Sequence, residues 1–346
     1  MKIIKSLLCI FLAGIFAVQS ATAAKSHVLE FNISSGGSTL PASARLSMEQ
    51  NLVKLLTMMS DAQAKDSKTL DFSGISITPD AKSAILLLWK YNHMRVGTDQ
   101  ERGVRSISEK LLNMQNVGNY QIRNIPVCLF PTESPGTCKR SEISVNFSRT
   151  GTITDLNLTM ERQQYDSLIE GVVNVQEQQN IMMLVHWMDQ LRTAYETKNL
   201  EYLMSLFDEK AVIITGVRTS KLTQMDNNVF KNKETFDYYI YNKGQYRTKM
   251  SNVFRNNKEV NVNFLEQQYG YNDMISVVDA DGNETPRYYM VWCTQQWMAS
   301  NYQDVGRLFV LWDFKNPEEP RIMVRAWTNP DDPKQFSEDD FILSTD

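Results

Sequence analysis

The sequence is poor in the residues that build metal sites and reactive nucleophiles. Its 346 residues include only three histidines, His27, His93 and His186, and four cysteines. No HExxH motif or paired cysteine spacing is present, so a dedicated zinc site is not expected. There is also no Gly-x-Ser-x-Gly nucleophile motif and no glycine fingerprint for a dinucleotide. The sequence therefore indicates no catalytic residue, no metal and no cofactor.

Clustered positive charge is also lacking. The chain has 36 Lys and Arg residues against 40 Asp and Glu residues, which gives a net charge of −4. Without its first 23 residues it keeps 34 basic and 40 acidic residues, a net charge of about −6. Nucleic-acid binding needs basic residues gathered against the phosphates, so nucleic acid is not an expected partner.

A long hydrophobic run occurs only at the N-terminus. Lys2 and Lys5 precede an apolar run over 7–18, and Ala21-Thr22-Ala23 then matches the small-x-small pattern that signal peptidase requires. The run is shorter than the roughly 20 residues that a membrane-spanning helix needs. We therefore interpret residues 1–23 as a removable signal peptide. The protein is expected to have no transmembrane span and to be exported, to the periplasm, the cell surface or the medium.

Three cysteines remain after cleavage. Cys128 and Cys138 bracket a turn-rich loop, and an oxidising compartment favours a disulfide between them. The alternative is two free thiols in a reducing cytoplasm. Cys293 lies in a predicted strand and is expected to be a buried small apolar residue.

Helix and strand signals divide the rest of the chain into two units. Residues 24–45 are expected to be a flexible lead-in, since they include a small polar Ser-Ser-Gly-Gly-Ser-Thr stretch. Residues 46–170 are predicted to form an α+β domain, because helix signals come first and alternating strand signals follow. Its predicted elements are a helix over 47–65, a helix opened by Thr78-Pro79-Asp80, and strands over 121–130, 142–148 and 152–159.

The second unit begins with the clearest helical pattern in the chain. Apolar residues at spacings of three and four form one stripe along a helix, namely Ile181, Leu184, Met188, Leu191 and Tyr195. The predicted elements that follow are a short helix capped by Asn199, a strand over 211–216, a helix over 245–256, and strands over 260–268, 288–299, 306–314 and 321–327. An acidic tail over 331–346 is expected to fray.

This order of elements resembles the NTF2-like (cystatin-like cone) fold, a curved antiparallel sheet wrapped around helices. The segments 191–195, 199–203 and 206–213 are similar to the helical opening of such domains, and the resemblance covers about 176–330. It implies an α+β fold class, with an N-terminal α+β domain followed by an NTF2-like domain.

The whole mature chain also resembles a family of exported bacterial two-domain proteins without an assigned activity. The segments that carry this likeness are 120–126, 302–306, 308–314 and 322–327. The likeness supports the architecture and supplies no substrate.

NTF2-like domains include ketosteroid isomerases and small dehydratases, which use a carboxylate base and a Tyr or protonated Asp donor inside an apolar cone. The resemblance would place such a base near Thr215-Gly216-Val217, where this sequence has no acid. The sequence therefore departs from the isomerase pattern at the position of the base.

Alternation along the last two predicted strands predicts an apolar face that packs on the helices. It would consist of Leu308, Val310, Trp312, Phe314, Ile322, Val324 and Ala326. Asp313 and Arg325 are then expected on the opposite face and close together. With Trp327 they are candidates for a subunit or domain interface.

Aromatic residues are dense in the second unit. They can fill the core, or some of them can line a ligand pocket of the kind that this fold often holds. The candidate pocket residues are Tyr195, His186, Trp292, Trp312 and Tyr288.

Two hypotheses of function follow. The first is an exported non-catalytic protein of binding or envelope assembly, whose partner is a small apolar ligand, an envelope protein or a second copy in a homodimer. The alternative is an isomerase-like or dehydratase-like enzyme that uses the apolar cone, with Tyr195 or His186 as donor or base.

Overall fold

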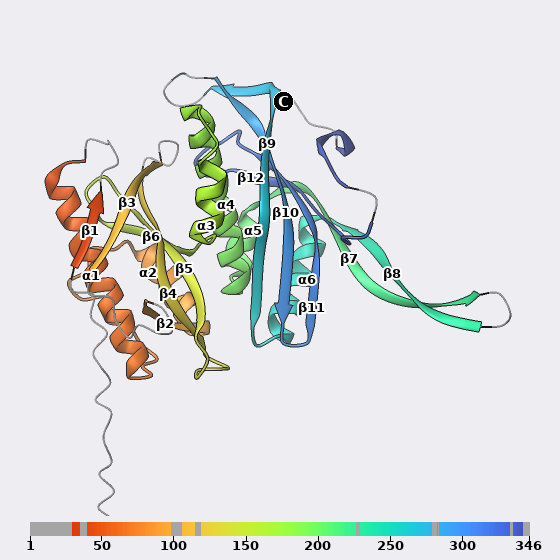
Figure 1. Ribbon diagram of the computed structural model, residues 1–346, viewed down its shortest axis with the longest axis horizontal. Helices are drawn as coiled ribbons and strands as arrows, with labels where there is room; N and C mark the ends of the chain where they lie inside the picture. Colours follow the sequence, from red (N-terminus) through yellow and green to blue (C-terminus); the bar gives the residue numbers. More distant parts are fainter. Residues whose placement is uncertain are drawn as a thin grey trace, which may run out of the picture.

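The computed structural model describes residues 30–34, 40–97, 106–114, 119–225, 229–278, 282, 284–332 and 335–341 (Figure 1). The predicted signal peptide, residues 1–23, lies outside the described residues. The chain has an α+β fold with two six-stranded sheets, as the sequence predicts for the fold class. In the described part of the chain, no helix is long and apolar enough to cross a membrane.

The first sheet belongs to the N-terminal half. Its strands lie in the order β1-β3-β4-β5-β6, and β2 also pairs with β4. Helices α1 and α2 pack on it through a core that includes Leu52, Leu55, Ile85 and Leu88. The elements are β1 Glu30–Ser34, α1 Ala42–Ala64, α2 Pro79–Tyr91, β2 Asn92–Val96, β3 Ser106–Met114, β4 Asn119–Pro131, β5 Lys139–Phe147, β6 Ile153–Leu158 and α3 Arg162–Ile169.

Part of the expected lead-in belongs to this first sheet. Strand β1 and the first turn of α1 fall within residues 24–45. Phe31 and Ile33 point toward the core and are only 2% and 5% exposed. Strand β1 pairs with β3 in parallel. Two apolar residues beside a glycine-rich stretch are too weak a pattern to stand out in the sequence. Strands β2 and β3 and helix α3 were not predicted either.

The second sheet belongs to the C-terminal half, with strands in the order β8-β7-β12-β11-β10-β9. Four neighbouring pairs are antiparallel and β7–β12 is parallel, so the sheet is mixed and not purely antiparallel as expected. The elements are α4 Val175–Glu196, α5 Leu200–Ser205, β7 Phe207–Met225, β8 Val229–Tyr241, α6 Lys243–Asn256, β9 Val260–Val278, β10 Glu284–Ala299, β11 Tyr302–Asp313, β12 Arg321–Thr328 and the 3₁₀ turn η2 Glu338–Asp340.

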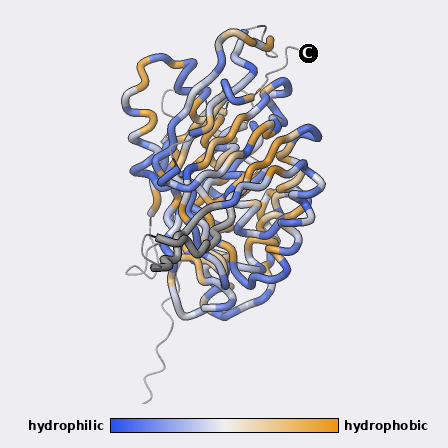
Figure 2. The backbone as a smooth tube through the Cα atoms, turned by 90° about the vertical axis from the view of Figure 1, so that its right-hand side faces the viewer, coloured by the Kyte–Doolittle hydropathy of each residue, from blue (hydrophilic) through white to orange (hydrophobic). Residues whose placement is uncertain are grey.

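Asparagine side chains begin all three helices of this half. Asn174, Asn199 and Asn242 accept backbone N–H groups at the starts of α4, α5 and α6, and Asn242 forms a reciprocal capping box with Gln245. The helices pack on one face of the second sheet, called the inner face. In Figure 2 several of the hydrophobic stretches, coloured orange, lie on strands in the middle of the molecule.

A β-bulge in the hairpin of β11 and β12 changes which side chains reach the inner face. Trp312 pairs with Ile322, but Leu311 pairs with Val324, so the register shifts at Met323. The extra residue reverses the alternation beyond it. Ile322 therefore packs on the helices, while Val324 and Ala326 lie in a separate cluster on the opposite, outer face. The single apolar face expected for both strands is wrong from Val324 onward.

The outer face is covered in part by the end of the chain. Phe336 and Phe341 pack on the outer-face cluster. The rings of Phe341 and Phe309 stack with centroids 5.9 Å apart, and Trp292 Nε1 donates to the carbonyl of Phe336 at 3.1 Å. The expectation of a frayed tail is therefore wrong for 335–341; residues 342–346 lie outside the described residues.

Helix α4 joins the two halves, since one side packs on the second sheet and the other faces β4 and β6 (Figure 1). Polar groups are buried at this junction. Arg123 of β4 and Asp189 of α4 form an ion pair at 2.8 Å, and both side chains are only 4% exposed. Asp189 also accepts the backbone N–H of Met160. A buried pair this well hydrogen-bonded fixes the position of α4 on the first sheet.

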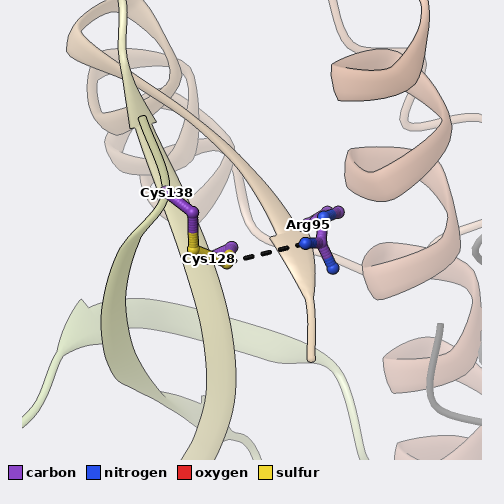
Figure 3. Close-up of a disulfide and its surroundings, with 3 residues drawn as sticks. All are labelled: Arg95, Cys128 and Cys138. Carbon is purple, nitrogen blue, oxygen red and sulfur yellow. Dashed lines mark hydrogen bonds between the residues drawn. A yellow bond between two sulfur atoms is a disulfide. The ribbon is translucent and has the colours of Figure 1, made fainter. Parts of the chain in front are cut away.

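Cys128 and Cys138 form a disulfide across the β4–β5 hairpin, and Arg95 lies beside it (Figure 3). The hairpin closed by this bond reaches the second half. Glu133 in its loop pairs with Lys258 at 3.0 Å, and Lys139 lies 3.6 Å from the buried carboxylate of Glu196. The disulfide therefore shapes a loop that bridges the two halves.

Candidate functional site

A cavity of about 250 Å³ lies between α6 and the inner face of the second sheet. We call it the cone cavity. Strands β7, β10, β11 and β12 and helix α6 all contribute to its wall. Its apolar lining includes Met250, Val253, Trp297, Ala299 and Trp327. A space of this size fits a single small organic molecule.

Arg325 is the most distinctive polar residue of the cone cavity. It comes from β12 and is only 4% exposed. Its Nη2 donates to Gln295 Oε1 at 2.6 Å, and its guanidinium carbon lies 5.9 Å from the ring centroid of Tyr246. Its Nε is buried with no hydrogen-bond partner. Among the described residues, no carboxylate oxygen lies within 4.0 Å of its guanidinium group.

The guanidinium group stays charged despite its burial. Burial alone would lower the pKa of Arg325, but the adjacent Tyr195 and Tyr246 more than offset this and raise its pKa above the ordinary value. The two tyrosine hydroxyls are hydrogen-bonded to each other at 2.7 Å. Burial raises the pKa of Tyr246 well above its usual value, so that hydroxyl stays neutral. The cavity thus holds a fixed positive charge beside the neutral hydroxyl of Tyr246.

Asp304 and Lys249 also line the cone cavity. Burial raises the pKa of Asp304 above its ordinary 3.8, although the hydrogen bond from Tyr302 and the charges of Arg325 and Lys249 oppose this. One carboxylate oxygen, Oδ1, is buried without a hydrogen-bond partner. Lys249 is partly exposed and donates to Thr215 Oγ1 at 2.9 Å.

Two glycines make room for Trp327 in the cavity wall. A Cβ atom added to Gly216 would lie 2.1 Å from Trp327 Cζ3, and one added to Gly306 would lie 2.2 Å from Trp327 Cε2. Both distances are far below van der Waals contact. The indole ring of Trp327 therefore lies flat across two strands because both of these positions lack a side chain.

The five predicted pocket residues are not brought together. Tyr195 and Trp312 lie in the inner-face core, where Tyr195 contacts Trp297 with ring centroids 5.4 Å apart. Tyr288 and Trp292 point to the outer face, because they alternate with the inward residues of β10. His186 lies on the side of α4 that faces the first sheet, where it bonds Gln121 at 3.2 Å.

The three predicted interface residues do not share a face. Asp313 pairs with Arg287 at 2.9 Å. Arg325 and Trp327 line the cone cavity, so the expected proximity of Asp313 and Arg325 on an outer surface is wrong. The bulge at Met323 is the physical reason, since it shifts the register of β12 by one residue.

Sequence reasoning missed Gln295, Asp304, Lys249 and Tyr246 as site residues. Gln295 carried a usable signal, because it lies in phase with Cys293 and Trp297 on an otherwise apolar strand face. A polar residue at an inward position often marks a site. Asp304 and Lys249 carried no such signal, because they come from a strand end and a polar helix.

A second hollow of about 580 Å³ lies between the two halves. His186, Trp187, Asp155 and Gln190 line it. Gln190 donates to Asp155 at 2.5 Å, and burial lowers the pKa of His186 from 6.5 to about 4. Most of the polar groups here already bond to one another, so this hollow is a polar junction between the halves. In the described part of the chain, no group of three or more His, Cys, Asp or Glu residues is placed to hold a metal ion.

Comparison with solved structures finds likenesses over about half of the chain. The Bdellovibrio bacteriovorus protein Bd1075 is 10% identical, with a TM-score of 0.32, over 52% of this chain and 56% of that one. An NTF2-like protein of unknown function from Shewanella oneidensis is 11% identical, with a TM-score of 0.27, over 43% of this chain and 98% of that one. The beta subunit of benzoate 1,2-dioxygenase from Burkholderia mallei is 8% identical, with a TM-score of 0.27, over 45% of this chain and 90% of that one.

The match spans little more than half of the Bdellovibrio protein. No protein-family model matches the chain, and no curated protein matches it. The comparisons therefore assign it no family and no function.

Proposed function

We propose that this is an exported protein whose NTF2-like C-terminal half binds a small organic anion in the cone cavity. The observation that carries the proposal is Arg325, a buried guanidinium group whose Nε has no partner and which has no carboxylate within 4.0 Å among the described residues. A buried charge without a counter-ion is costly. An anion that enters the cavity would remove this cost and form charge-assisted hydrogen bonds.

The rest of the cavity suits an anion with an apolar body. Trp297 and Trp327 offer flat apolar walls, and Met250 and Val253 close the side formed by α6. A carboxylate bound at Arg325 would also lie beside the hydroxyl pair of Tyr195 and Tyr246. The proposed ligand class is therefore a monocarboxylate with an aliphatic body.

Binding is favoured over envelope assembly through the outer sheet face. Assembly was expected to use Asp313, Arg325 and Trp327 together, but Asp313 lies apart from Arg325 and Trp327, which line the cone cavity. The apolar outer face is in addition partly covered by Phe336 and Phe341. These two features leave less apolar surface for an envelope protein or a second copy.

Export is part of the proposal and has its own test. The disulfide between Cys128 and Cys138 is compatible with an oxidising compartment. The full chain, expressed in a bacterium with a reporter for the periplasm, is expected to begin at Ala24 after processing. A mature protein that starts at Met1 and stays in the cytoplasm would contradict export.

Calorimetric titration with 4-methylpentanoate tests the binding proposal. Wild-type protein is expected to bind it, and Arg325→Met is expected to reduce the affinity at least about tenfold, because the charge-assisted bonds are lost. Arg149→Gln, which changes an exposed arginine in the β5–β6 turn, is the matched control and should bind normally. Equal affinity in wild type and Arg325→Met would contradict the proposal.

Asp304 supports a second candidate, an enzyme that uses the cone. A carboxylate with a raised pKa that lines the same cavity as a buried tyrosine hydroxyl, that of Tyr246, can remove a proton from a carbon next to a carbonyl. Deuterium exchange from solvent into a bound ketone or carboxylate, lost in Asp304→Asn, would support this candidate. No exchange above the uncatalysed rate would leave binding as the function.

A further inference from the structure

Residues that line the cone cavity carry buried polar atoms of both hydrogen-bonding kinds without a partner. Arg325 Nε is an unpaired donor. Asp304 Oδ1 and Asn257 Oδ1 are unpaired acceptors, and both residues line the same cavity. Buried polar atoms in folded proteins are nearly always hydrogen-bonded, so unpaired atoms around one cavity indicate what a ligand supplies. A simple carboxylate could satisfy the arginine but could not donate to either acceptor.

Arg325 and Asp304 do not neutralise each other directly. Both residues are described, and no nitrogen of Arg325 lies within 4.0 Å of an oxygen of Asp304. The two groups nevertheless interact electrostatically. The charge of Arg325 lowers the pKa of Asp304, although burial raises it by more. The two opposite charges therefore line the same small cavity without forming an ion pair with each other.

We infer, on the basis of the proposed anion site, that the ligand is an amino or hydroxy acid. Its carboxylate binds Arg325, and its ammonium or hydroxyl group donates to Asp304. The cavity volume of about 250 Å³ limits both groups to one small molecule. The apolar side chain of that molecule packs on Trp297 and Trp327, which line the same cavity.

The two candidate ligands, an amino acid and a hydroxy acid, differ in net charge. An amino acid is neutral overall and balances the pair of Arg325 and Asp304. A hydroxy acid carries one negative charge and also balances Lys249, which is partly exposed and bonded to Thr215. The shared feature is a carboxylate and a hydrogen-bond donor on one molecule.

Three ligands with the same carbon skeleton test the inference by calorimetry with the purified protein. They are leucine, 2-hydroxy-4-methylpentanoate and 4-methylpentanoate. Leucine or the hydroxy acid is expected to bind at least about tenfold more tightly than 4-methylpentanoate, because only these two can donate to Asp304. Which of the two binds more tightly identifies the donor as ammonium or hydroxyl.

Asp304→Leu removes the acceptor while keeping a similar volume. In this variant the advantage of leucine or the hydroxy acid over 4-methylpentanoate is expected to vanish, because no acceptor remains for the donor group. Asp166→Leu on the exposed surface of α3 is the matched control, and far-UV circular dichroism checks that both variants fold. The comparison of the three ligands on wild-type protein stands even if Asp304→Leu does not fold.

The outcomes separate the inference from the proposed function. If 4-methylpentanoate binds wild type as tightly as the other two, the inference is overturned and the anion site stands. An advantage that persists in Asp304→Leu also overturns it, because the donor is then recognised elsewhere. If none of the three ligands binds, both the inference and the anion site fail.

Discussion

His186 illustrates how strongly its surroundings determine what a residue can do. In the alternative enzyme hypothesis it is a pocket donor or base, but the side chain lies 2% exposed against the first sheet and bonds Gln121. Burial, with a further effect from the charge of Arg123, lowers its pKa to about 4. A histidine in this state is neutral at physiological pH and serves as a structural hydrogen-bond partner.

His186 should make the protein less stable in acid. The unfolded chain takes up a proton on this residue below about pH 6.5, whereas the folded chain does so only below about pH 4. Stability conferred by His186 is therefore full above pH 6.5 and falls as the pH drops toward 4, by about 2 to 3 kcal/mol at pH 4.5. Urea unfolding of wild type and His186→Gln at pH 7 and pH 4.5 measures the difference. A difference in unfolding free energy between wild type and His186→Gln that is the same at both pH values would contradict the expectation.

Gly306 should tolerate no side chain, because its missing Cβ leaves the space that Trp327 fills. Gly306→Ala is expected to lower the free energy of unfolding by about 1 to 3 kcal/mol through overpacking. It should also weaken ligand binding, since Trp327 forms part of the cavity wall. Gly136→Ala is the control, because nothing lies within 4 Å of a Cβ added there. Equal stability of the two variants would contradict this account of Trp327.

At the scale of elements, residues 335–341 are part of the fold because they cover part of the outer sheet face. Phe336 and Phe341 pack on Trp292 and Phe309 of the outer sheet face. Replacing both phenylalanines with serine is expected to expose this surface and cause concentration-dependent association.

Sedimentation velocity over a range of concentrations measures that association. Leu46→Ser, which changes an exposed leucine of α1, is the control and should leave the oligomeric state unchanged. A double variant that sediments like wild type at every concentration would show that the aromatic pair does not protect the outer face.

Elements with a local signal could be predicted from the sequence. Thr78 before Pro79, and Asn199 before Leu200, mark helix starts that the structure confirms. Strand β8 could not be predicted, because its polar sequence has no clear alternation and pairing with β7 holds it in place. The bulge at Met323 could not be predicted either, because it depends on how β12 meets both of its neighbours.

The same limit applies to the candidate site. The sequence marked Arg325 as an interface candidate on the outer face, but one extra residue in β12 places it in the lining of the cone cavity. Asp304 and Tyr246 meet it only through the folding of β11 and α6 around the sheet. A site assembled from five elements leaves no spacing pattern in the sequence.

At the scale of the whole molecule, the junction on α4 should make the two halves unfold together. Removal of one partner of the Arg123–Asp189 pair leaves a buried charge uncompensated, so Asp189→Asn is expected to cost about 3 to 5 kcal/mol. Thermal unfolding of wild type, followed by far-UV circular dichroism and tryptophan fluorescence, should show one coincident transition. Two separate transitions in wild type would contradict a shared junction.

The central claim is that the cone cavity binds a small organic anion at Arg325. A crystal structure of the protein grown with 2-hydroxy-4-methylpentanoate or leucine tests it most directly. We predict electron density for the ligand in the cavity, with its carboxylate within hydrogen-bonding distance of Arg325 and its donor group near Asp304. A cavity that stays free of ligand at saturating concentration, or a ligand whose carboxylate lies away from Arg325, would contradict the claim.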